Sequence, residues 1–160
     1  MITSNKVGCA FCCGVLMVII FCFVLLINES KIYQIDIAEI PHNSDIQWWI
    51  DSVVTTPHTT KIEGWIFLHK EIIREFTCRF VLYDTRTQKA YIIPSQLRAR
   101  PDVEEAYNPN KEKRDYNYTN SGLVGNVLNF KLEEPYSSYK IYILYENNDN
   151  NFIVDTNRRI

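Results

Sequence analysis

The residue types that most often carry catalysis or bind metal ions are scattered through this sequence. The three histidines, His42, His58 and His69, lie in separate expected turns or strand ends, with no spacing that would bring them to one metal ion. The carboxylate pairs Glu104/Glu105 and Glu133/Glu134 are adjacent in sequence, and adjacent side chains on a helix or strand point in different directions. These pairs therefore predict solvated charge, not an acid–base dyad.

Nucleophile and cofactor motifs give no stronger signal. The sequence contains no glycine-rich phosphate loop and no nucleophile elbow. Cys78 is the only cysteine after residue 22, and its apolar strand pattern predicts a buried, inert thiol. We therefore predict no catalytic residues, no cofactor and no metal site, and we expect that the protein is not an enzyme.

Aromatic residues are the feature that could form a ligand site. The strand alternation predicts that Trp65, Phe67, Tyr83 and Tyr142 point away from the core across neighbouring strands. Aromatic faces arranged in this way can stack against sugar rings. The alternative interpretation is that these residues are cross-strand pairs, partly covered by the long segment 94–120.

An apolar stretch, Val7–Ile27, contains no charged residue and no proline. At about 1.5 Å per residue it predicts a helix of roughly 31 Å, which matches a hydrocarbon core of about 30 Å. A cleaved signal peptide has a shorter apolar core and small residues at its end, but here Asn28 follows the stretch. A lipoprotein signal needs small residues before its cysteine, and Cys22 follows isoleucine and phenylalanine. We therefore predict an uncleaved anchor whose partner is the lipid bilayer.

The anchor divides the chain into unequal parts. We expect residues 1–6 to be a cytoplasmic tail, 7–27 the transmembrane helix, 28–45 a stalk or first strand, and 46–160 a domain outside the cytoplasm. The orientation rests on Lys6 and on the small size of the N-terminal segment. After the helix, sixteen basic residues face nineteen acidic ones, so this part has no basic field for nucleic acid. The predicted localisation is the cell membrane, with a single pass.

In the rest of the chain, apolar and polar residues alternate as they do in short β-strands. Polar turns separate segments with period-two hydrophobicity, and the only helical signal is a turn at 101–107. This pattern predicts an all-β antiparallel sandwich of seven to eight strands behind one N-terminal helix. The expected strands are Tyr33–Ile40, Ile46–Val54, Ile62–Leu68, Phe76–Tyr83, Ala90–Ile93, Val124–Leu132, Tyr139–Tyr145 and Phe152–Val154, the first of them also readable as an extended stalk.

Three residues around the long segment 94–120 have expected structural roles. Asp102 is placed to cap the helical turn, with Glu105 three residues later returning the bond as a capping box. Arg100 is placed to fasten the segment to the sheet. Gly122 marks the return of the chain to the sheet, where a positive φ is expected.

Several short motifs, taken in order, resemble a known module. They are Gly64-Trp65-x-Phe67, Arg100-x-Asp102-Val103, Ser121-Gly122-Leu123, Tyr139-Lys140-Ile141-x-Ile143 and Asp155-Thr156-x-Arg158-x-Ile160. The set resembles a small immunoglobulin-like module of bacterial envelope proteins associated with surface polysaccharide assembly, over about residues 46–160. Leu123 stands where that module is expected to have phenylalanine. The resemblance implies the fold, a surface setting and a structural role for Gly64, and it carries no catalytic residues.

Together these observations predict a membrane-anchored binding or assembly module of the cell envelope that is associated with polysaccharide. The first alternative is a protein–protein interaction subunit of an envelope complex. A further alternative is an accessory domain of a hydrolase or transferase. The expected partners are the bilayer through Val7–Ile27 and either a glycan or an envelope protein, and not nucleic acid.

Overall fold

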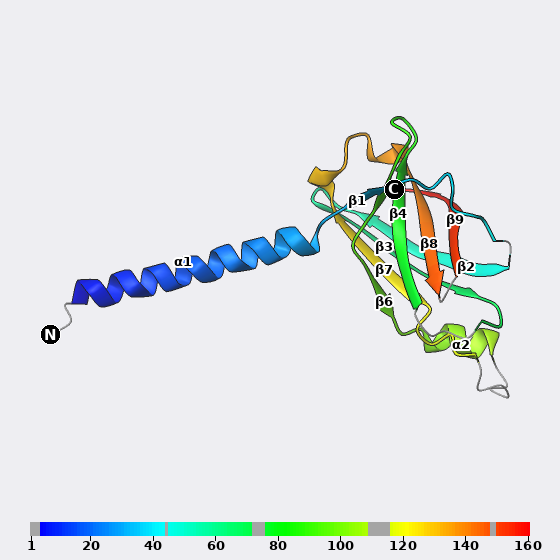
Figure 1. Ribbon diagram of the computed structural model, residues 1–160, viewed down its shortest axis with the longest axis horizontal. Helices are drawn as coiled ribbons and strands as arrows, with labels where there is room; N and C mark the ends of the chain where they lie inside the picture. The colour runs from blue at the N-terminus through cyan, green and yellow to red at the C-terminus, as the bar shows by residue number, and fades with distance from the viewer. Residues whose placement is uncertain (1–3, 44, 72–75, 109–115, 148–149) are drawn as a thin grey trace. The chain divides into compact units, whose positions relative to one another are not determined.

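The computed structural model describes residues 4–43, 45–71, 76–108, 116–147 and 150–160 (Figure 1). The contacts divide the chain into two units, Met1–Lys31 and Ile32–Ile160. The first unit contains one helix, α1 (Ser4–Glu29), and the second contains the strands. This division supports the predicted separation of an N-terminal helix from a β domain.

Helix α1 has 26 residues, and its window Phe11–Asn28 is long and apolar enough to cross a membrane. A signal sequence near an N-terminus meets the same criterion. The large apolar side chains along this window, such as Phe11 and Met17, are solvent-exposed in the isolated chain. A single N-terminal apolar helix is therefore confirmed.

The second unit consists of two antiparallel sheets. The five-stranded sheet has the order β1 (Tyr33–Ile35), β5 (Lys89–Ile92), β4 (Phe76–Asp84), β8 (Tyr139–Asn147) and β9 (Asn150–Arg159). The four-stranded sheet has the order β2 (Ile46–Thr55), β3 (Thr59–Leu68), β7 (Gly122–Leu128) and β6 (Ser95–Arg98). Short helices α2 (Pro101–Tyr107), η1 (Asn129–Lys131) and η2 (Tyr136–Ser138) lie in the connections.

The predicted antiparallel β architecture is confirmed as two sheets. The described residues form nine strands, whereas seven or eight were predicted. The strand that the hydrophobic pattern does not predict is β6. It directly follows Pro94, and its residues from Gln96 to Arg98 are exposed, so it shows no apolar alternation.

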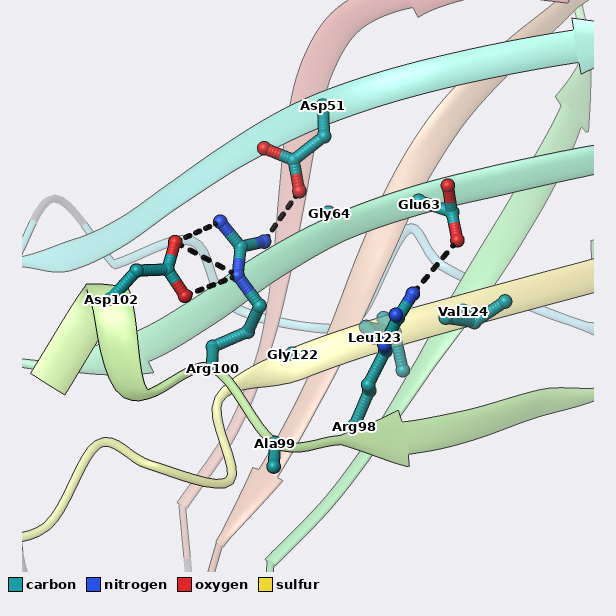
Figure 2. A pocket seen from close by; sticks show the side chains of 10 residues that line it. All are labelled: Asp51, Glu63, Gly64, Arg98, Ala99, Arg100, Asp102, Gly122, Leu123 and Val124. Atoms are coloured by element: carbon teal, nitrogen blue, oxygen red, sulfur yellow. Dashed lines mark hydrogen bonds and ion pairs between the residues drawn. The ribbon is translucent and has the colours of Figure 1, made fainter.

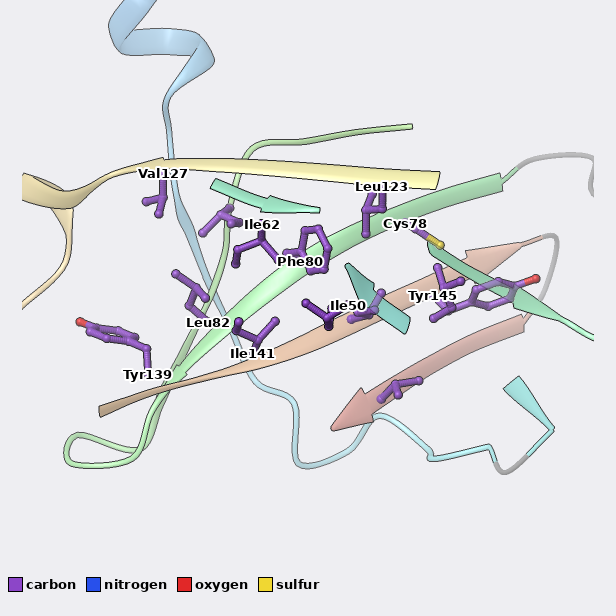
Figure 3. Close-up of a cluster of buried hydrophobic side chains, with 14 of the residues drawn as sticks. Ile50, Ile62, Cys78, Phe80, Leu82, Leu123, Val127, Tyr139, Ile141 and Tyr145 are labelled. Atoms are coloured by element: carbon purple, nitrogen blue, oxygen red, sulfur yellow. The ribbon is translucent and has the colours of Figure 1, made fainter. Parts of the chain in front are cut away.

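The two sheets enclose one main core (Figure 3). The four-stranded sheet contributes Ile62, Ile66, Leu123 and Val127, and the five-stranded sheet contributes Phe80, Leu82, Ile141 and Ile143. Cys78 is buried within this core, and burial raises the pKa of its thiol. The prediction of a buried thiol at Cys78 is therefore confirmed.

A second, smaller apolar cluster lies on the outer face of the five-stranded sheet. Residues 36–41, the crossover segment, follow β1 and cross this face. Ile37 and Ile40 pack there against a buried patch made of Val81, Ala90, Leu144 and Ile153. The backbone N–H of Ile153 donates to the carbonyl oxygen of Pro41 at 3.0 Å. Residues 28–45 were predicted to be either a stalk or a first strand. Within them the structure has the strand β1, and residues 36–41 pack on the sheet instead of forming a free stalk.

Two glycines allow close approach of neighbouring backbone in the four-stranded sheet. A Cβ on Gly64 would collide with the backbone oxygen of Trp49, next to the β-bulge at Asp51 in β2. A Cβ on Gly122 would lie 2.5 Å from the backbone oxygen of Arg98 and 2.6 Å from Cγ of Arg100. The predicted positive φ of Gly122 is wrong, because no described glycine has one. Gly122 instead makes room for the side chain of Arg100.

Replacing Gly64 with alanine is expected to destabilise the β unit, because backbone of the bulged strand must move to admit the new methyl group. Overpacking of this kind costs about 1–3 kcal/mol. Thermal unfolding of the full-length protein in detergent, followed by tryptophan fluorescence, should show a lower midpoint. Gly14→Ala in α1 is the control, because no atom lies within 4 Å of its added Cβ. Equal midpoints for the two variants would contradict the tight packing at Gly64.

Candidate functional site

The structure separates the four aromatic residues of the predicted ligand face. Trp65 and Phe67 lie on β3 of the four-stranded sheet, while Tyr83 on β4 and Tyr142 on β8 belong to the five-stranded sheet. Each pair lies on the outer face of its own sheet. The prediction of one common face is wrong because the chain changes sheets between β3 and β4.

The Trp65 and Phe67 pair is covered by the segment that contains α2. Phe67 is fully buried in a cluster with Val103 of α2 and Tyr118. The ring of Phe67 stacks on Tyr118 with centroids 4.1 Å apart, and Trp65 contacts Tyr107 at 5.4 Å. The alternative interpretation, coverage by residues 94–120, is therefore confirmed on this sheet, and Phe67 is not accessible to a ligand.

A polar cavity of about 340 Å³ lies on the same face, and Figure 2 shows its charged side chains. The aliphatic part of the Arg100 side chain passes Gly122, and its guanidinium lies between two carboxylates, with Nη1 2.5 Å from Asp51 and Nη2 2.7 Å from Asp102. Arg100 also donates its backbone N–H to Thr119 at 2.6 Å. Arg100 therefore fastens the long segment to β2, as predicted.

The predicted capping role of Asp102 is wrong. The residue at the N-cap of α2 is Arg100, which makes no side-chain cap, and Asp102 lies inside the first turn. The hydrogen bond from Arg100 holds the pKa of the Asp102 carboxyl at about 2. The predicted capping box with Glu105 is also wrong, because the backbone N–H of the N-cap residue Arg100 donates to Thr119. Glu104 instead accepts from the backbone N–H of Tyr118 and from the side-chain amide of Asn108, which ties the end of α2 to the returning chain.

The charges around this cavity neutralise one another. Arg98 donates to Glu63 at 3.2 Å, and Lys61 contacts the same carboxylate at 2.8 Å. These ion pairs, with the hydrogen bond from Ser52, lower the pKa of Glu63. Since each of its acidic and basic groups has a partner in the protein, this cavity is best explained as a clamp that holds α2 against the sheet.

A larger depression of about 580 Å³ lies on the outer face of the five-stranded sheet. Tyr83 and Tyr142 meet there edge to face, with ring centroids 5.9 Å apart. We call this depression the tyrosine hollow; its other lining residues are Gln34, Ile35, Asp36, Ile37, Ala38, His42, Gln88, Lys89, Ala90, Ile153 and Asp155. Its volume falls within the range of about 300–1,000 Å³ that is typical of small-ligand sites.

Hydrogen bonds fix one of the two rings of the tyrosine hollow. The hydroxyl of Tyr142 donates to Oδ2 of Asp155 at 3.0 Å, and Nζ of Lys140 lies 3.5 Å from the same oxygen. Burial, followed by the bond to Asp155, raises the pKa of Tyr142 to about 12. The phenol therefore stays protonated at neutral pH and keeps Asp155 as its acceptor.

Other polar side chains of the tyrosine hollow are unused. Gln34, His42, Gln88 and Lys89 make no side-chain hydrogen bond or ion pair with the part of the chain that the structure describes. Gln34 and Lys89 lie on the side of their strands that carries Tyr91, which packs in the inner core, so the amide of Gln88 and the imidazole of His42 are the groups available to the hollow. The hollow thus combines two aromatic rings with free hydrogen-bonding capacity.

The β4–β5 hairpin that carries Gln88 and Lys89 is held by a buried carboxylate. Asp84 accepts the backbone N–H of Arg86 at 3.0 Å and the hydroxyl of Thr87 at 3.1 Å. Burial raises the pKa of the Asp84 carboxyl, but its hydrogen bonds outweigh this effect and hold the pKa at about 2. This residue positions one wall of the hollow.

No sequence motif links Gln34, His42, Lys89 and Asp155, which line one hollow in the structure. They come from segments far apart in the chain, and only the sheet order and the crossover segment bring them together. The structure does not bring the three histidines together, and no group of three metal-binding side chains occurs within the described ranges. Comparisons with protein-family models, curated proteins and solved structures found no match.

The low pKa of the Asp84 carboxyl predicts that the folded protein loses stability in acid. Its pKa is lower in the folded protein than the value of about 3.9 in an unfolded chain, so its charged form stabilises the fold above about pH 4. This contribution, roughly 2 kcal/mol, should disappear as the pH falls from about 4 to 2. Asp84→Asn should lower the free energy of unfolding at pH 7 and flatten its dependence on pH in this window.

Denaturant unfolding of the full-length protein in detergent, measured from pH 2 to pH 7, tests this prediction. Asp45→Asn is the control, because Asp45 is exposed and its carboxylate makes no hydrogen bond to the described residues. If the Asp84 variant kept the acid limb of the wild-type curve, another group would have to account for the pH dependence.

Proposed function

We propose that this protein is a single-pass membrane-anchored binding module of the cell envelope, with its β unit outside the cytoplasm and a saccharide as its ligand. The observation that carries the ligand class is the pair Tyr83 and Tyr142, which faces a hollow with unused polar side chains. The resemblance to immunoglobulin-like envelope modules agrees with this proposal.

The anchor is supported by the exposed apolar surface of α1. In water, exposed side chains such as Phe11 and Met17 would be unfavourable, whereas a bilayer solvates them. A helix also satisfies its own backbone hydrogen bonds, as a lipid environment requires. The positive charge of Lys6 favours a cytoplasmic N-terminus.

The saccharide is supported by the chemistry of the tyrosine hollow. Sugar rings present C–H groups that pack on aromatic faces, and hydroxyl groups that exchange hydrogen bonds with amides and imidazole. Tyr83 and Tyr142 supply the first kind of contact, and Gln88 and His42 supply the second. The arrangement accounts for binding without any bond-breaking step.

A protein partner is the second candidate, and one observation favours it. On the outer face of the four-stranded sheet, the side chain of Trp49 is 53% exposed. Tyr107, whose ring contacts Trp65 on that face, is 41% exposed. Exposed aromatic side chains are enriched at protein interfaces. Because Arg158 already lies over the Trp49 ring, 5.9 Å from its centroid, this surface is partly occupied by the protein itself.

The anchor predicts that the full-length protein remains in the membrane fraction after carbonate washing of cells. The physical reason is the length and apolar character of the window Phe11–Asn28. The control is a variant that lacks residues 1–31, which should enter the soluble fraction. Recovery of a soluble wild-type form that begins near residue 30 would identify α1 as a cleaved signal sequence.

The ligand proposal predicts the effect of removing one ring. Full-length protein in lipid nanodiscs should bind members of a glycan array, and Tyr83→Ala should weaken this binding several-fold, since an aromatic contact contributes about 0.5–1.5 kcal/mol beyond its burial. Trp49→Ala, which removes an exposed ring from the opposite sheet, should bind as the wild type does. Absence of wild-type binding to any glycan would reject the saccharide and favour the protein partner.

A further inference from the structure

Phe130, in η1, is the most exposed large apolar side chain that the structure describes, at 79%. Two other exposed rings of the β unit, Trp49 and Tyr107, contact an arginine and other aromatic rings respectively. Among the ring contacts in the described part of the chain, that of Phe130 is with its neighbour Lys131, whose Nζ lies 6.0 Å from the ring centroid. Phe130 therefore presents an apolar ring to the surroundings of the protein.

Hydrogen bonds and packing fix the chain on both sides of Phe130. The buried Asn129 donates its backbone N–H to the carbonyl oxygen of His58 at 2.8 Å and its side-chain amide to the carbonyl oxygen of Thr56 at 2.7 Å. Leu132 is buried in the main core and donates its backbone N–H to Asn129 at 2.9 Å. The exposed position of Phe130 is therefore built into the fold, because an inward turn of this residue would break these contacts.

This part of the surface lies near the point where the chain enters the β unit. Tyr33, the first residue of β1, pairs with Ile92 of β5 and is itself 59% exposed. Two residues after Ile92, the carbonyl oxygen of Pro94 accepts the backbone N–H of Asn126 in β7 at 3.0 Å. Figure 1 shows the same neighbourhood, with the start of β1 beside the end of β7, after which η1 begins. Two exposed aromatic residues thus lie on the side of the β unit from which the chain continues to α1.

The chain between α1 and β1 is short. Helix α1 ends at Glu29 and β1 begins at Tyr33, so at most roughly 14 Å of extended chain separates these two residues. The apolar window of α1 ends at Asn28, which places Glu29 at the membrane surface when the helix spans a bilayer. Because the headgroup layer is about 5–8 Å thick on each side, the start of β1 then lies within reach of the lipid headgroups.

We propose that an interfacial patch, made of Tyr33, Phe130 and Lys131, rests on the lipid surface beside the anchor. The inference rests on the proposed function, because it requires α1 to span the membrane. Aromatic rings are enriched where a bilayer meets water, and lysine extends its ammonium toward the headgroups while its stem stays on apolar surface. The anchor keeps the patch close to the bilayer, so a weak contact is sufficient to hold the β unit against it.

Quenching of tryptophan fluorescence by brominated lipid tests this contact. Full-length wild type and Phe130→Trp are compared in nanodiscs of phosphatidylcholine with and without bromine on the acyl chains. The fluorescence that the new tryptophan adds should fall at least about twofold in the brominated discs, because an interfacial ring lies next to the acyl chains. The matched control is Tyr107→Trp, which adds an exposed tryptophan in α2, at the other end of β7 (Figure 1). Its added fluorescence should be the same in both kinds of disc.

The outcomes separate this inference from the proposed function. If the protein stays in the membrane fraction but the added fluorescence at position 130 is not quenched, the inference is overturned, the proposed function stands, and the exposed ring of Phe130 is assigned to a protein partner. Equal quenching at positions 130 and 107 also overturns the inference, because the β unit then has no preferred side toward the bilayer. Loss of the wild type from the membrane fraction after carbonate washing overturns both.

Discussion

Contact between the inner faces of the two sheets is the interaction on which the rest of the β unit depends. Cys78 is the only cysteine in this unit, so no disulfide within it can hold the sheets together. Phe80 and Ile62, both fully buried, instead meet in a core that draws side chains from both sheets (Figure 3). Because this packing uses the inner faces, each outer face is left for a different purpose.

The outer faces of the two sheets are covered by different parts of the chain. On the four-stranded sheet, Arg100 joins α2 to Asp51, and aromatic side chains fill the space around Phe67 (Figure 2). On the five-stranded sheet, the crossover segment covers the patch around Ile153 and leaves Tyr83 and Tyr142 beside a depression. The first face therefore contributes to stability, and the second retains chemical groups that no other part of the described chain uses.

The sequence was sufficient to predict most strands, because alternation reports which side chains of a strand are buried. Cys78 and Phe80 are examples, since both lie on the inner face of β4 as expected. Alternation does not report which sheet a strand joins, and so Trp65 and Tyr83 were assigned to one face although their strands belong to different sheets. For the same reason, Asp155 could not be placed beside Tyr142 and Tyr83 before the sheet order was known.

In the proposed function, the aromatic rings of the tyrosine hollow determine how it holds a sugar. Aromatic rings such as Tyr83 accept many sugars, because stacking requires only a flat apolar surface. A shallow hollow of this kind is expected to bind each sugar segment weakly, yet many copies held in one membrane can engage one polymer together. In the proposed arrangement, α1 therefore contributes to binding as well as to localisation, since it converts weak single contacts into retention of a long chain.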